Sequence, residues 1–169
     1  MEENKRRKES IRLQGFDYNS AGAYFITICT KNRKQMLSRI VGGDALDAPS
    51  RVILLPYGKI ADKYIRQLND FYDTIRVDGY VVMPNHIHIL LMVFEDGASR
   101  TSPPTKQHSA VPRFVSTFKR FCNKEYGSNI WQRYYNDHII RDREGYDKHL
   151  NYIQENPIHW QEDELYTKA

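Results

Sequence analysis

Two strongly apolar segments separated by a short turn place the tightest constraint on the fold of this 169-residue chain. The first covers residues 77–82 and the second residues 89–94, with Pro84 and Asn85 between them. Short apolar runs rich in β-branched residues are typical of strands, and a Pro-Asn pair favours a tight turn. The sequence therefore predicts two strands joined by a turn.

Two histidines, His86 and His88, lie between this turn and the second apolar segment. Alternate residues of a strand share one face, so both side chains are expected to project in the same direction, with Cα atoms about 6.5–7 Å apart. Two imidazoles at that separation can bind one metal ion. The spacing alone leaves an alternative open, in which one or both are core histidines with satisfied hydrogen bonds.

The remaining segments alternate between patterns typical of strands and of helices. The other predicted elements are, in order, a strand over residues 23–30, a loop over 42–50, a helix beginning at Pro56, a connection over 95–110, a helix over 112–126, a strand over 130–140 and a helix over 144–155. This order indicates an antiparallel sheet with helices packed on one face. We therefore predict a ferredoxin-like α+β fold with an additional C-terminal helix.

The charge of the chain is mildly positive and unevenly distributed. Lysine and arginine total 25 against 21 acidic residues, which gives a net charge of +4. Such an excess suits a polyanionic partner only where it is concentrated on one surface. It is concentrated in a basic arm over residues 1–17 and on the helix over 112–126. The alternative is a solvated tail and a solvated helix face.

The composition also excludes several classes of protein. Cys29 and Cys122 are too few and too far apart for a disulfide framework or a cysteine-rich zinc site. The first twelve residues are charged, and no apolar stretch reaches membrane-spanning length, so neither a signal peptide nor a transmembrane helix is expected. We expect a protein of the reducing cytoplasm.

The predicted C-terminal helix presents two different faces. Tyr146, Leu150 and Ile153 follow the i, i+4, i+7 spacing of a stripe that faces the core. Tyr152 lies about 100° away from Ile153, and its neighbours one turn away are Lys148 and Asn156. A nucleophile beside a metal ligand needs such an arrangement. The alternative is an exposed surface tyrosine followed by a helix stop at the Asn-Pro pair.

Three parts of the sequence together resemble the REP-associated tyrosine transposases, single-tyrosine members of the HUH endonucleases. They are Val82 to His88, then residues 130–132 with 137–141, and finally Asn151 to Pro157. In that family a His-hydrophobic-His strand carries two metal ligands, and the tyrosine follows on a later helix. The resemblance covers about residues 18–160, which we predict to be one domain between the basic arm and a tail over residues 161–169.

The resemblance implies a metal-dependent enzyme that nicks and joins single-stranded DNA near a hairpin. His86 and His88 would bind Mg²⁺ or Mn²⁺ with Asn156 as third ligand, and Tyr152 would attack to give a 5′-phosphotyrosine. It also implies a prokaryotic, nucleoid-associated location, and it leaves monomer and homodimer open. The candidate DNA contacts are basic residues of the arm and the helices, namely Lys5, Arg6, Arg7, Lys8, Arg12, Lys119, Arg120 and Lys148.

Rival functions remain open at this point. A ferredoxin-like module that binds nucleic acid without cutting it would explain the charge and the aromatic residues, but not two histidines on one face of an apolar strand. A metal-dependent hydrolase of small phosphoesters would use an activated water and would not need Tyr152. A host-domesticated enzyme that processes repeated palindromes would have the same residues as a mobile element's transposase.

Overall fold

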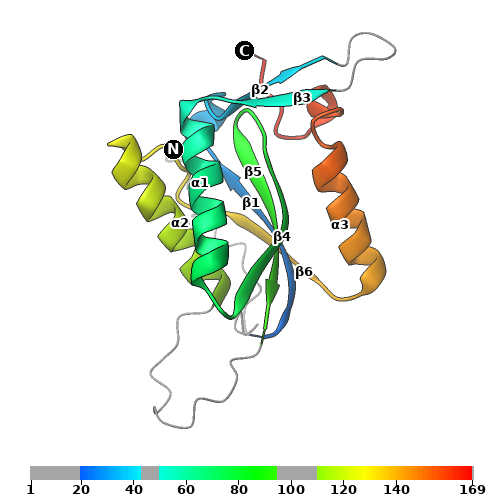
Figure 1. Ribbon diagram of the computed structural model, residues 1–169. Helices are drawn as coiled ribbons and strands as arrows, with labels where there is room; N and C mark the ends of the chain where they lie inside the picture. Colours follow the sequence, from blue (N-terminus) through cyan, green and yellow to red (C-terminus); the bar gives the residue numbers. More distant parts are fainter. Residues whose placement is uncertain (1–19, 43–49, 95–109, 169) are drawn as a thin grey trace, which may run out of the picture.

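The computed structural model describes residues 20–42, 50–94 and 110–168. Its main sheet has four antiparallel strands in the order β4-β5-β1-β6 (Figure 1). The strands are β1 Gly22–Cys29, β4 Ile75–Val82, β5 His86–Val93 and β6 Asn136–Ile140. Apart from one inserted hairpin, the chain connects them as strand, helix, strand, strand, helix, strand, the ferredoxin-like order. The predicted fold class is confirmed.

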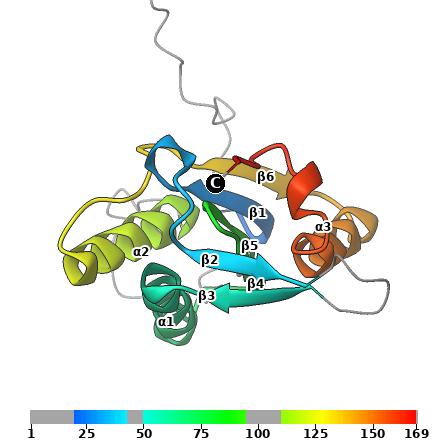
Figure 2. The same ribbon diagram turned by 90° about the horizontal axis from the view of Figure 1, so that it is seen from above.

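Helices cover both faces of this sheet. Helices α1 (Pro56–Phe71) and α2 (Ala110–Tyr126) pack side by side on one face, and α3 (Arg143–Glu155) lies on the other (Figures 1 and 2). This is the predicted arrangement of helices on one face with an additional C-terminal helix. The predicted bounds of these helices were correct to within two residues at the ends that the prediction fixed.

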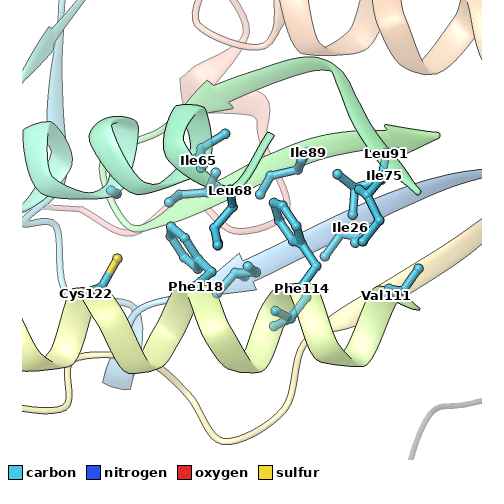
Figure 3. Packing of buried hydrophobic residues seen from close by; sticks show 14 of the residues in the cluster. Ile26, Ile65, Leu68, Ile75, Ile89, Leu91, Val111, Phe114, Phe118 and Cys122 are labelled. Atoms are coloured by element: carbon cyan, nitrogen blue, oxygen red, sulfur yellow. The ribbon is translucent and has the colours of Figure 1, made fainter. Parts of the chain in front are cut away.

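The larger core lies between α1, α2 and the sheet. Figure 3 shows Phe114 and Phe118 of α2 pointing toward Ile65 and Leu68 of α1 and toward the strands beneath them. Both phenylalanines are fully buried, and each buried aromatic side chain removes roughly 150–250 Å² of surface from water. This core covers one face of the sheet, so that strand β5 presents its other face toward α3.

Strand β5 alternates between two environments. Ile87, Ile89 and Leu91 point into the core beneath α1 and α2, whereas His86 and His88 point to the face that carries α3. The period of two along a strand produces this separation. The histidines therefore share one face, as predicted, and that face is opposite the large hydrophobic core.

Helix α1 begins at Pro56, as predicted, because proline at the first helical position has a suitable φ and needs no N–H partner there. A Cβ atom on Gly58 would lie 1.9 Å from the carbonyl oxygen of Leu37, so only glycine allows the helix to pack here. Leu68 on the inner side of this helix is buried, whereas Phe71 at its end is 68% exposed.

Two features differ from the prediction. Strands β2 (Ser38–Val41) and β3 (Arg51–Leu54) form a separate two-stranded hairpin that the sequence analysis missed. Strand β6 begins at Asn136 instead of residue 130, because the preceding segment turns away after Trp131, which is fully buried and forms a single bridge to Thr30. Short strands with few apolar residues give little periodic signal.

Some predictions concern residues outside the described part of the chain. They are the basic arm over 1–17, the connection over 95–109 and most of the loop over 42–50. Among the described residues, none of the helices combines the length and the apolar character needed to cross a membrane.

Candidate functional site

The two histidines of β5 meet at their outer ring nitrogens. Nε2 of His86 lies 3.0 Å from Nε2 of His88, and the exposed fractions of the two residues are 0% and 3%. Two ligand atoms that each lie about 2.1 Å from a shared ion, at right angles to one another, would be about 3 Å apart. The pair therefore has the spacing of two neighbouring metal ligands.

The inner ring nitrogens are held by polar neighbours. Nδ1 of His86 lies 2.8 Å from Oδ1 of Asn85, and Nδ1 of His88 lies 2.8 Å from the hydroxyl of Thr27. Asn85 is fixed in turn, because its amide nitrogen donates to the carbonyl of Leu165. The Asn85 oxygen can only accept, so His86 donates from Nδ1 and a neutral ring presents an unprotonated Nε2.

Burial favours the neutral form of both rings. It lowers the pKa of His86 to about 4, although the negative charge of Asp163 acts in the opposite direction. The pKa of His88 is well below its usual value, because of burial and then of the neighbouring His86 and His149. Neutral imidazoles keep the lone pair that a metal ion requires, so binding would not first have to remove a proton.

A carboxylate from the C-terminal segment completes this cluster. Asp163 follows a 3₁₀ helix (Trp160–Glu162), and its Oδ2 lies 3.8 Å from Nε2 of His86. The ligand atoms of His86, His88 and Asp163 all lie within 4.8 Å of one another. Asp163 was not predicted from the sequence, because no pattern distinguishes it from the two acidic residues beside it. The described part of the predicted tail thus contributes to the site.

Asn156, the predicted third ligand, lies next to Asp163 at the end of α3. Its amide nitrogen donates to Oδ2 of Asp163 at 2.9 Å, and the residue is only 3% exposed. Its Oδ1 is buried and has no hydrogen-bond partner among the described residues. A buried carbonyl oxygen without a partner is costly, and a bound cation would satisfy it. The donor set of two imidazoles, an amide oxygen and a carboxylate therefore fits a divalent cation.

Tyr152 lies on the open side of the same cluster. Its hydroxyl is 3.4 Å from Oδ2 of Asp163, its ring centroid is 5.2 Å from that of His88, and it is 43% exposed. Partial burial and the negative charge of Asp163 raise the pKa of Tyr152 to about 12. The phenol is therefore protonated at neutral pH and needs an acceptor for its proton before it can act as a nucleophile.

Helix α3 is fixed to the sheet in a way that determines where Tyr152 lies. Asp142 caps its first turn by accepting a hydrogen bond from the backbone N–H of Gly145. The hydroxyl of Tyr146 donates to Asp78 of β4 at 2.7 Å, and Leu150 packs over Gly79. A Cβ atom on Gly79 would lie 3.1 Å from Cδ1 of Leu150, which is tighter than an ordinary contact. The predicted inward stripe of α3 is confirmed.

The structure separates the predicted DNA contacts. Lys148 is exposed on α3 and lines the same cavity as Tyr152. Arg120 is exposed on α2, across the sheet from α3. Lys119 is partly buried, donates to the backbone carbonyl of Gln132 at 2.9 Å, and has a pKa lowered by burial to about 8. The five residues of the N-terminal arm lie outside the described residues.

Comparison with known proteins places these observations in a family. No protein-family model matches the chain. An uncharacterized protein of Haemophilus influenzae is 31% identical over 95% of this chain and 93% of its own length. A REP-associated tyrosine transposase of Escherichia coli is 25% identical over 83% of this chain and 69% of its own length. A second Haemophilus influenzae relative, provisionally assigned to the same group, is 26% identical over 84% of this chain and 73% of its own length.

The fold agrees with these relatives. A solved structure of a REP-associated tyrosine transposase bound to a REP hairpin superimposes with a TM-score of 0.55, at 21% identity, over 94% of this chain and 73% of that one. The chain belongs to the family of REP-associated tyrosine transposases. Its function is accordingly of the transposase type, the processing of DNA.

Proposed function

We propose that this protein is a metal-dependent endonuclease and strand transferase that cleaves single-stranded DNA near a hairpin, with Tyr152 as nucleophile. One observation carries the proposal. The Tyr152 hydroxyl and Nε2 of His86, which lies 3.0 Å from Nε2 of His88, approach the same carboxylate oxygen, Oδ2 of Asp163, at 3.4 Å and 3.8 Å respectively. A protonated phenol, two neutral imidazoles and a carboxylate are the groups that metal-assisted transesterification at a phosphate requires.

The metal ion would be held by Nε2 of His86 and His88 and by the orphaned Oδ1 of Asn156, with the charge of Asp163 beside it. This mixed nitrogen and oxygen set suits Mn²⁺ or Mg²⁺. When bound, the ion supplies Lewis-acid stabilisation of the charge that develops on the non-bridging phosphate oxygens. The nucleophile and the acceptor of its proton are side chains of the protein.

The chemical step is a transesterification. Tyr152 Oη forms a bond to phosphorus while the bond from phosphorus to the 3′ oxygen of the DNA breaks, which gives a 5′-phosphotyrosine and a free 3′-hydroxyl. The phenol proton passes to Asp163, the acceptor that the hydroxyl already faces, and the departing 3′ oxygen takes a proton from solvent. The phosphodiester energy is retained in the covalent link, so a second 3′-hydroxyl can reverse the reaction without ATP.

A hairpin is proposed as substrate because the solved structure of one relative contains a REP hairpin. The basic arm over residues 1–17 and Lys148 are the expected contacts to hairpin and strand phosphates. Such contacts would make the affinity fall steeply as salt rises.

A covalent-adduct assay tests this function. The protein is incubated with labelled DNA that carries a hairpin with single-stranded flanks from its own genomic surroundings, in Mn²⁺ or in EDTA, and is resolved on a denaturing gel. We expect a shifted band in Mn²⁺ that is absent in EDTA and in Tyr152→Phe. Tyr134→Phe is the matched control, because Tyr134 is also exposed (57%) but belongs to the segment before β6. Tight binding without any adduct would contradict the proposal and favour a non-catalytic binding module.

A further inference from the structure

Helix α3 packs mainly against β4 and β5 of the sheet (Figures 1 and 2). Toward β1 and β6 it makes ring contacts through His149. A cavity of about 1010 Å³ lies along the uncovered side of the helix and borders both His88 and Tyr152. Ligand pockets commonly have volumes of about 300–1,000 Å³. This space is large enough for a nucleotide beside the nucleophile.

A row of flat rings forms one side of the cavity. Phe25 of β1 stacks on His88, with ring centroids 5.0 Å apart and an interplanar angle of 25°. Its ring centroid lies 4.7 Å from that of His149 on α3 and 5.9 Å from that of Tyr152. His149 stacks in turn on His138 of β6, which does not itself line the cavity, at 5.2 Å and 24°. The rings thus extend from the reactive hydroxyl to the edge strand.

The charges around the cavity nearly cancel. Two basic residues face three acidic ones, and the guanidinium of Arg143 is paired with Asp147 at 3.0 Å. A channel for the phosphate backbone would carry a clear positive excess. A cavity lined by aromatic rings and by nearly balanced charges suits a nucleobase instead. Nδ1 of His149 contacts the carbonyl of Gly145 at 2.7 Å, which leaves its Nε2 and the amide of Asn151 as groups that can meet a base edge.

We infer that this cavity binds one unpaired nucleobase of the strand that flanks the scissile phosphate, stacked on Phe25 and His149. The inference rests on the proposed function and specifies how the substrate is placed. Tyr152 and His88 belong to the wall of the same cavity, so a base seated there holds its own phosphate next to the attacking hydroxyl. Stacking accepts any base, because each has a π-face, and the polar groups at the rim provide selectivity.

The test measures binding by Tyr152→Phe protein, which cannot cleave, in Mn²⁺. The probe is hairpin DNA with single-stranded flanks, and each flanking position is replaced in turn by an abasic residue. We expect one position next to the cleavage site where loss of the base weakens binding about tenfold, the effect of one stacked base. In a Phe25→Leu background the same abasic probe should bind no more weakly than the intact probe.

Control variants separate stacking from damage to the fold. Phe25→Tyr keeps the ring and should retain the abasic penalty, and His149→Ala should reduce it. Phe71→Leu makes the same change as Phe25→Leu at an exposed phenylalanine on α1 and should leave the penalty intact. Phe25→Leu should not alter the dependence of affinity on salt, because no phosphate contact is lost.

Two negative outcomes have different meanings. If intact probes bind but no flanking position shows an abasic penalty, or if the penalty persists in both Phe25→Leu and His149→Ala, the base-binding inference is wrong. If no hairpin probe binds at all, the proposed function itself is wrong.

Discussion

Replacing Tyr146 with phenylalanine removes the hydroxyl that ties the nucleophile helix to the sheet. This hydroxyl donates to Oδ2 of Asp78 at 2.7 Å, and the side chain of Asp78 is only 8% exposed. Hydrogen bonds to charged groups contribute about 1.5–3 kcal/mol. Because Tyr146 is only partly buried, solvent screening reduces this contribution to the lower end of that range or slightly below it, and we expect a loss of about 1–1.5 kcal/mol. For a chain of this size the loss corresponds to a fall in Tm of about 2–6 °C.

The stability lost in Tyr146→Phe should depend on pH in a defined direction. Burial alone would raise the pKa of Asp78, but hydrogen bonds from Arg76 and Tyr146 outweigh it and lower the pKa below its usual value. A carboxyl group whose pKa is depressed in the folded state stabilises the fold above its unfolded pKa of about 3.9, and that contribution disappears as the pH falls through the folded pKa. The difference between wild type and Tyr146→Phe should therefore be full at pH 7 and should shrink below about pH 4.

Urea unfolding of both proteins between pH 3 and pH 7, followed by circular dichroism, measures this difference. Asp78→Asn is the partner variant, and adding Tyr146→Phe to it should cost less than adding Tyr146→Phe to the wild type. A difference that is absent at pH 7, that does not change with pH, or that is equally large in the Asp78→Asn background would refute the reasoning.

Three further changes probe the site and its support. Asp163→Asn should weaken Mn²⁺ binding about 10–100-fold in calorimetric titration, because the negative charge next to His86 is lost. An unchanged affinity would show that Asp163 is not part of the metal site. Asn85→Ala should weaken Mn²⁺ binding by a similar factor, because Nδ1 of His86 loses its hydrogen-bond partner. An affinity equal to that of the wild type would show that this contact does not orient the His86 ring. Gly79→Val should destabilise the fold by about 1–3 kcal/mol through a clash with Leu150, and Leu150→Ala should relieve that clash in a double variant. A lack of rescue would mean that α3 does not pack as described.

The parts of the fold that could be predicted from sequence are those set by local periodicity. The histidine pair could be placed because a strand fixes which side chains share a face, and Pro84 and Asn85 fix where the strand begins. The faces of α3 followed in the same way from the spacing of Tyr146, Leu150 and Ile153. These arguments need only residues that are near one another in the chain.

The parts that could not be predicted depend on contacts between distant segments. Asp163 reaches His86 only because the chain turns back after α3 and is held there, for example by the hydrogen bond from Asn85 to the carbonyl of Leu165. No periodic pattern in the sequence predicts that the chain turns back toward His86. The hairpin of β2 and β3 has four residues in each strand, too few for a strand pattern to stand out. Lys119 was expected on a DNA-binding surface, yet its side chain holds backbone carbonyls of the segment before β6.

Identifying the residue that becomes attached to DNA tests the central claim most directly. The protein is reacted with hairpin DNA in Mn²⁺, digested with nuclease and trypsin, and analysed by mass spectrometry. Trypsin should release the peptide of residues 149–168, which contains Tyr152 and Tyr166, and fragmentation distinguishes these two tyrosines. The account predicts a nucleotide phosphate on Tyr152 that is absent when EDTA replaces Mn²⁺. A nucleotide on Tyr166 or on any other residue, or an adduct that forms equally well in EDTA, would contradict it.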